Sequence, residues 1–159
     1  MKNLLLASAI ALFGAVNAQT TGNFKLGAHV GLPVGDAADG YSLLVGADLA
    51  YMWPIAPTFN LGIASGYSAW IGKNDYDTGN MIPIAAAAEY KFSPEFSLGV
   101  DLGYGVIFAT GESVNGFYYQ PKAAYHFGPS EVYVGYVGLT KSDLTFSAIN
   151  LGYAYTFGK

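Results

Sequence analysis

The stretch that decides the fold is Phe96-Ser97-Leu98-Gly99-Val100-Asp101-Leu102-Gly103-Tyr104-Gly105-Val106-Ile107-Phe108. Every second residue in it is large and apolar, and the residues between them, as far as Gly105, are Ser, Gly or Asp. A period of two is typical of a β-strand, because successive side chains point to opposite faces. This strand therefore has one large apolar face and one face of small or polar residues.

The same alternation recurs along the chain and predicts eight strands. The expected strands are 24–34, 45–53, 59–71, 82–92, 96–108, 117–127, 132–137 and 149–157. The interior of an eight-stranded barrel is narrow, so it accepts Gly and Ala more readily than many Phe, Tyr and Leu side chains. We therefore predict an all-β fold, an eight-stranded antiparallel up-and-down barrel whose large apolar face points into lipid.

The connections and the aromatic residues predict an orientation. Short connections are expected at 54–58, 93–95 and 128–130, and they alternate with longer ones at 35–42, 72–80 and 110–116. The last connection, around 141–143, is on the side of the longer ones and is short. Short turns face the periplasm in such barrels, which puts both ends of the barrel domain there. An aromatic belt is expected at that interface, formed by Phe24, Trp53, Phe59, Phe92, Phe96, Phe127 and Phe157. A second group near the other interface consists of Tyr67, Trp70, Phe108, Phe117 and Tyr119. Pro121 lies in mid-strand, where we expect a bulge.

Composition limits the classes of function. The chain has 159 residues, of which 11% are charged, and it has no Cys, which excludes disulfides and thiolate metal sites. The net charge is −4 without a basic stripe, so no nucleic-acid partner is expected. The positive start Met1-Lys2-Asn3, an apolar run and the cleavage pattern Val16-Asn17-Ala18 predict a signal peptide at residues 1–18 and a barrel domain at 19–159.

Several short motifs resemble those of a known family. They are Leu26-Gly27-Ala28-His29-Val30-Gly31-Leu32-Pro33, Ile82-Pro83-Ile84 with Glu89-Tyr90-Lys91-Phe92, Asp101-Leu102-Gly103-Tyr104-Gly105 and Leu151-Gly152-Tyr153-Ala154-Tyr155-Thr156-Phe157. The chain resembles the small outer-membrane β-barrel proteins of Bacteroidetes-type bacteria, often labelled a porin family, and is similar in architecture to OmpX-like and OmpA-like barrels. The resemblance implies location in a Gram-negative outer membrane after signal-peptide cleavage. The expected partners are membrane lipid, lipopolysaccharide, the barrel assembly machinery and a surface or host ligand at the loops.

Charged residues on the small face are expected inside the barrel. They are Lys25, Asp48, Glu89, Lys91, Asp101 and Lys122, and His29 is expected beside Asp48. Counting from the turns puts Glu89, Asp101 and Lys122 at similar heights. One interpretation is a salt-bridge plug, because buried charges must be paired. The other is a selectivity lining. We favour the plug, since eight strands enclose little beyond side chains.

Enzyme and metal functions have weak support in the sequence. Hydrolysis of outer-leaflet lipid needs a Ser, a His and a carboxylate together, and the two histidines, His29 and His126, fall away from that leaflet. The loop Lys73-Asn74-Asp75-Tyr76-Asp77-Thr78-Gly79-Asn80 repeats part of a calcium loop without its closing Glu. We expect no catalytic site, no metal site and no cofactor.

Two functions remain open at this stage. The first is a filled structural or surface-interaction barrel that displays short outer loops. The alternative is a narrow pore for small solutes or ions, whose path would be lined by Asp48, Asp101 and Lys122.

Overall fold

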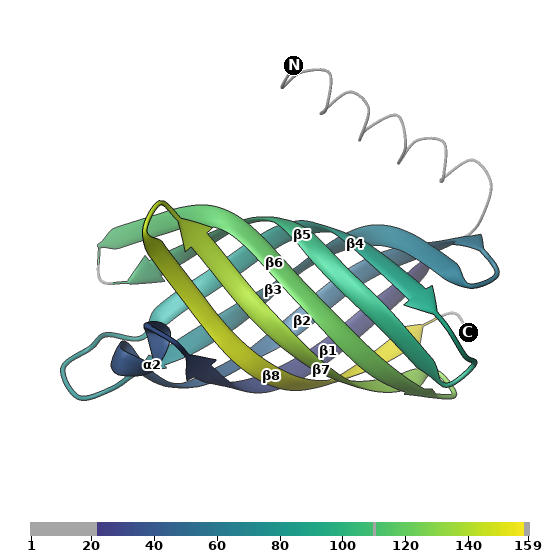
Figure 1. Ribbon diagram of the computed structural model, residues 1–159, viewed down its shortest axis with the longest axis horizontal. Helices are drawn as coiled ribbons and strands as arrows, with labels where there is room; N and C mark the ends of the chain where they lie inside the picture. Colours follow the sequence, from purple (N-terminus) through teal and green to yellow (C-terminus); the bar gives the residue numbers. More distant parts are fainter. Residues whose placement is uncertain (1–21, 110, 158–159) are drawn as a thin grey trace, which may run out of the picture.

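The computed structural model describes residues 22–109 and 111–157, so the expected signal peptide at 1–18 lies outside the described residues. The elements are β1 (Asn23–Val34), α2 (Ala37–Gly40), β2 (Tyr41–Ala56), β3 (Phe59–Gly72), β4 (Gly79–Lys91), β5 (Phe96–Ala109), β6 (Glu112–Phe127), β7 (Ser130–Lys141) and β8 (Leu144–Phe157). Each strand pairs antiparallel with its neighbour, and β8 pairs with β1, which closes the barrel (Figure 1). The predicted eight-stranded antiparallel barrel is confirmed. Among the described residues, no helix is long and apolar enough to cross a membrane.

The two ends of the barrel differ in their connections. One end, here called the loop end, carries α2 and the connections 35–40, 73–78, 110–111 and 142–143, and the other, the turn end, carries 57–58, 92–95 and 128–129. Figure 1 shows α2 and the 73–78 connection together at one end, away from the place where β8 finishes. β1 begins and β8 finishes at the turn end, since Phe24 pairs with Phe157.

The predicted long connection at 110–116 is wrong. β6 already begins at Glu112, and Ser113 to Gly116 pair with β5. The alternation of apolar residues lapses there, but the backbone ladder continues, because hydrogen bonding between strands does not require apolar side chains. Two of the four connections at the loop end are therefore as short as those at the turn end.

Two mid-strand prolines interrupt the sheet without a bulge. Pro121 pairs with Val100 on β5, while the ladder to β7 lacks pairs at Gln120 and Pro121 and resumes in the same register. Pro83 leaves a similar gap between β3 and β4. The bulge expected at Pro121 is wrong, because losing one N–H donor removes a rung but inserts no residue.

The outer surface carries the large apolar face of every strand. Ile84 is 72% exposed, Leu32 64% and Leu151 57%. At the turn end, aromatic rings contact one another from strand to strand: the centroids are 6.1 Å apart for Phe92–Phe96, 5.2 Å for Phe96–Tyr125, 6.0 Å for Tyr125–Phe127, 6.5 Å for Phe127–Tyr153 and 6.0 Å for Phe24–Phe157. Phe59, at the start of β3, is half-buried. Trp53 differs from the others because it is 6% exposed and packs edge-on against Tyr51 at 4.9 Å.

Candidate functional site

The lumen of the barrel has two parts of different chemistry. The half near the loop end holds an apolar plug, formed by Ala37, Leu44, Trp70, Met81, Ala85, Ile107, Tyr118, Val137, Leu139 and Ala148, with Tyr41 and Phe146 packed against it. The middle and the turn end hold a lumen network of charged side chains, formed by Lys25, His29, Asp48, Glu89, Asp101, Lys122, His126 and Glu131. The lumen is therefore apolar near the loop end and charged in the middle and at the turn end.

The apolar plug is closed to solvent. Leu44 and Trp70 are 0% exposed, and Met81 and Leu139 are 1% exposed. The Trp70 ring packs edge-on against Tyr41 at 5.8 Å and against Phe146 at 6.1 Å. Side chains from several strands thus meet at the barrel axis at this end.

The outer connections cover the plug. Ala37 of α2 is 4% exposed and belongs to the plug. The Lys73 ammonium donates a hydrogen bond to the Ala38 carbonyl at 2.6 Å, and the Lys73 N–H donates to the Gly40 carbonyl at 2.8 Å. These bonds fix the 73–78 connection on α2, so the two longer loops form one cap.

The position of Trp70 corrects a sequence prediction. It was expected among the outward aromatic residues, but it lies in the lumen. Along β3 it follows Ser68 by two residues, and Ser68 is buried on the inner face, so alternation directs Trp70 inward as well. It pairs with Gly79 on β4.

At the turn end, one ammonium group joins two carboxylates. Lys25 Nζ lies 3.2 Å from Glu89 Oε2 and 3.0 Å from Glu131 Oε2. Asn60 Nδ2 donates to the other oxygen of Glu89 at 3.0 Å. His126 Nδ1 lies 3.3 Å from Glu131 Oε2. Charges that are buried in this way are stable only when they are paired and hydrogen-bonded.

A second set of charges lies nearer the middle of the lumen. Lys122 Nζ lies 2.9 Å from Asp101 Oδ2 and 5.5 Å from the centre of the Tyr133 ring. The Tyr133 hydroxyl donates to Asp48, whose Oδ2 also lies 2.9 Å from His29 Nδ1. Asp48 therefore has two partners, from β1 and β7.

Each histidine lies between a serine and a carboxylate. His29 Nε2 is 3.0 Å from Ser68 Oγ, and its Nδ1 faces Asp48. His126 Nε2 is 2.7 Å from Ser97 Oγ, and its Nδ1 faces Glu131. The order of groups is that of a serine-hydrolase triad. The sequence missed both serines, because Ser97 on β5 meets His126 on the adjacent β6 and Ser68 on β3 meets His29 two strands away on β1, and the strand register that brings each pair together is not visible in a local pattern.

The lumen has no room for a substrate at these serines. Ser68 is 4% exposed and Ser97 is 2% exposed. Three cavities in the lumen of the described residues have volumes of about 30, 30 and 20 Å³. A cavity of that size holds one or two water molecules. The serines therefore serve to orient the imidazole rings by hydrogen bonding.

The sequence-predicted lumen residues fall in two groups. Lys25, His29, Asp48, Glu89, Asp101 and Lys122 all lie in the lumen network. Lys91 is half-buried at the turn end, and no ion pair among the described residues includes it.

Glu131 is a further residue of the lumen network that the sequence did not predict. It is 6% exposed and precedes the buried Tyr133 by two residues on β7. This spacing was the available signal, but large residues on both faces of β7 obscured it. Glu131 changes the expected balance of three acids and three bases in the lumen to four carboxylates and three lysines.

Comparison with known proteins gives a family and a fold. The family model described as "Putative MetA-pathway of phenol degradation" matches residues 2–153. Its description differs from that of the family which the sequence motifs resemble. No curated protein matches the chain in sequence.

Solved structures of outer-membrane barrels resemble the fold. Ail of Yersinia pestis is 15% identical, with a TM-score of 0.60 over 86% of this chain and 97% of that one. The N-terminal barrel of Pseudomonas aeruginosa OprF is 13% identical, with a TM-score of 0.57 over 87% and 100%. Neisserial surface protein A is 13% identical, with a TM-score of 0.51 over 86% and 97%. At these low identities the TM-scores show that the fold is shared.

Proposed function

The chain belongs to the family described as "Putative MetA-pathway of phenol degradation", and from this premise and its fold we propose that it is an integral outer-membrane barrel with a filled lumen. In this role the barrel anchors its outer loops at the cell surface and contributes to the envelope as a structural or interaction protein. We assign it no catalytic step.

The apolar exterior supports insertion into a membrane. Soluble proteins rarely expose wide apolar patches, because contact of apolar surface with water costs about 25 cal/mol per Å². Here Leu32, Ile84 and Leu151 are each more than half exposed, and similar residues project from all eight strands. A closed barrel also leaves no unpaired strand edge in hydrocarbon. In this setting lipid and lipopolysaccharide would cover the exterior, the barrel assembly machinery would insert the chain, and the expected leader at 1–18 would direct its export.

The filled lumen is supported above all by the apolar plug. Leu44, Trp70, Met81 and Leu139 are at most 1% exposed, and they lie across the loop end of the lumen. Ion pairs occupy the remaining length, and the lumen cavities between them are large enough for one or two water molecules each. A hydrated ion would have to displace the plug and separate the ion pairs to pass.

The family description also bears on the alternative function. It names phenol degradation. A barrel without catalytic residues would contribute to such a pathway by transport, and this would require a narrow pore for small solutes. The plug favours the filled barrel over this pore, and the conductance experiment below distinguishes them.

The charge of the loop end indicates which partners it would attract. Its connections and the strand ends beside them carry six acidic residues and two lysines: Asp36, Asp39, Asp75, Asp77, Glu112 and Asp143 against Lys73 and Lys141. One Ail structure holds the heparin analogue sucrose octasulfate. The acidic loop end of this chain would repel such a polyanion, so we propose a basic partner surface or divalent cations shared with lipopolysaccharide phosphates.

Single-channel conductance in planar bilayers tests the proposal. The refolded protein should insert and remain silent, with a conducting porin as the positive control for insertion. Lys122→Met should lower stability, because Asp101 loses its ion-pair partner at 2.9 Å, and conductance should stay near zero. Discrete openings of the wild-type protein, with an ion selectivity that Lys122→Met shifts, would establish the pore instead.

A further inference from the structure

We propose that Glu89, His126 and Glu131 form a binding site for one divalent metal ion of the zinc type, which binds by displacing the Lys25 ammonium. The site lies at the turn end of the lumen. The inference is independent of whether the barrel conducts, because it depends on the geometry of these four side chains.

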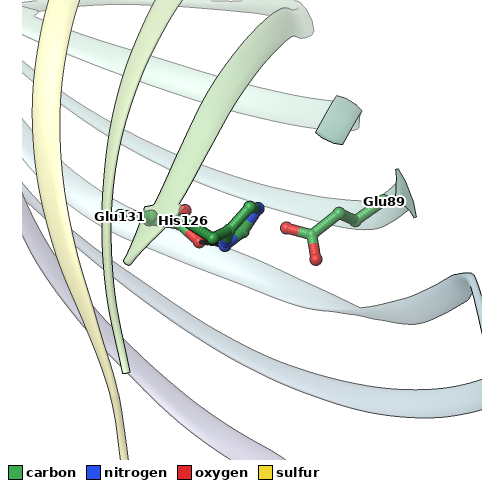
Figure 2. Close-up of side chains that lie close together, drawn as sticks. All are labelled: Glu89, His126 and Glu131. Carbon is green, nitrogen blue, oxygen red and sulfur yellow. Dashed lines mark ion pairs between the residues drawn. The ribbon is translucent and has the colours of Figure 1, made fainter. Parts of the chain in front are cut away.

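The three side chains converge from different strands. Glu89 extends from β4, His126 from β6 and Glu131 from β7. One ligand atom from each lies within 4.8 Å of the others. Figure 2 shows the Glu89 carboxylate directed across the lumen toward the His126 ring, which lies close to Glu131. A closed barrel fixes the backbone positions of all three, so that small changes in side-chain torsion suffice to bring them together.

The distances suit a small metal ion. Two ligands at zinc-bond lengths in a tetrahedral arrangement are about 3.4 Å apart. His126 Nδ1 and Glu131 Oε2 are 3.3 Å apart. Since the three ligand atoms lie within 4.8 Å of one another, Glu89 has to approach by at most about 1.4 Å to complete a three-ligand set, which leaves the fourth position for water. A cavity of about 20 Å³, enough for one ion or one water molecule, borders all three residues.

Hydrogen bonds from neighbouring side chains orient two of the proposed ligands, His126 and Glu89. Ser97 Oγ lies 2.7 Å from His126 Nε2, so an Nε2–H donated to Ser97 leaves the Nδ1 lone pair directed at Glu131. Asn60 holds Glu89 Oε1 at 3.0 Å and leaves Oε2 facing the site. Metal-binding histidines commonly donate their other ring nitrogen to such a partner. One imidazole with two carboxylates suits zinc better than magnesium or calcium, which prefer oxygen ligands alone.

The position of Lys25 indicates that the site attracts a cation. Its Nζ lies 3.2 and 3.0 Å from Oε2 of Glu89 and of Glu131. One ammonium neutralises only one of the two buried carboxylates, whereas a divalent ion neutralises both. Lys25 stands near the start of β1 at the turn end, where its flexible stem can turn toward the barrel opening. Lys25 is therefore the competitor that sets the affinity of the site.

Zinc titration of the untagged, refolded full chain tests this inference. In isothermal titration calorimetry we expect one equivalent of Zn²⁺ to bind at this site, with a rise in Tm, and Mg²⁺ at the same concentration not to compete for it. Lys25→Met should tighten zinc binding at least tenfold, because the competing ammonium is gone. His126→Asn should abolish binding, and Ser97→Ala should weaken it about 10- to 100-fold.

Matched variants separate this site from other sources of binding. Lys91→Met removes another lysine at the turn end that pairs with neither carboxylate, and it should change the affinity far less than Lys25→Met. Lys25→Arg keeps the positive charge and should bind zinc no more tightly than the wild type, which provides a test if Lys25→Met fails to fold. Absence of binding in both wild type and Lys25→Met overturns the proposal. Zinc binding that survives His126→Asn overturns it too, because the ion then sits elsewhere.

Discussion

Replacing Trp70 with Ala tests whether the apolar plug stabilises the barrel. Trp70 is 0% exposed and packs edge-on against Tyr41 at 5.8 Å and Phe146 at 6.1 Å. Truncating a buried aromatic side chain to Ala typically lowers the free energy of unfolding by about 3–5 kcal/mol, through lost transfer energy and the cavity left behind. The strands around the lumen cannot close this cavity, because the barrel fixes their separation.

The Trp70→Phe variant provides a control for the same position. Trp70 Nε1 is buried and has no hydrogen-bond partner among the described residues. An unpaired buried donor costs about 1–3 kcal/mol, so Phe loses part of the packing but also removes this cost. We expect Trp70→Phe to be destabilised much less than Trp70→Ala.

Equilibrium unfolding in urea, measured by tryptophan or far-UV signals in lipid vesicles, provides the free energies. An Ala variant within about 1 kcal/mol of the wild type would refute the argument that Trp70 fills the lumen. Such a value is typical of exposed positions rather than of buried ones.

Three further predictions concern the wall and the polar lumen. Ile84→Lys, at a position that is 72% exposed in mid-strand, should cost about 2–4 kcal/mol in a bilayer, and equal stability in lipid vesicles would contradict a lipid-facing wall. Gly46→Ala should cost about 1–3 kcal/mol and shift the imidazole NMR signals of His29, because a Cβ there would collide with the Tyr67 backbone carbonyl and lie 2.7 Å from the His29 ring; unchanged signals would contradict this packing. Tyr133→Phe should cost about 1–3 kcal/mol in urea unfolding, since Asp48 loses the phenol donor, and full stability would mean that the bond adds nothing.

Much of the fold could be predicted from residues close together in sequence. The alternation around Asp101, and its recurrence along the chain, identified eight strands and their inner and outer faces. Successive side chains in a strand point to opposite faces, so the position of a residue along the strand determines the face on which it lies. The strand ends were less well predicted. The segment from Glu112 to Gly116 lacks apolar alternation, yet it forms β6 because the ladder with β5 continues through it.

The sequence by itself therefore determined the barrel, its apolar exterior and most of its buried charges, because each follows from local periodicity and from the narrowness of eight strands. Only the tertiary structure decided which side chains meet. Lys25 joins Glu89 and Glu131, which are 64 and 106 residues away in sequence. Trp70 likewise meets Phe146 from a distant strand. Such contacts depend on barrel closure and on the stagger between strands, which set the height of each residue in the lumen and which no local pattern encodes.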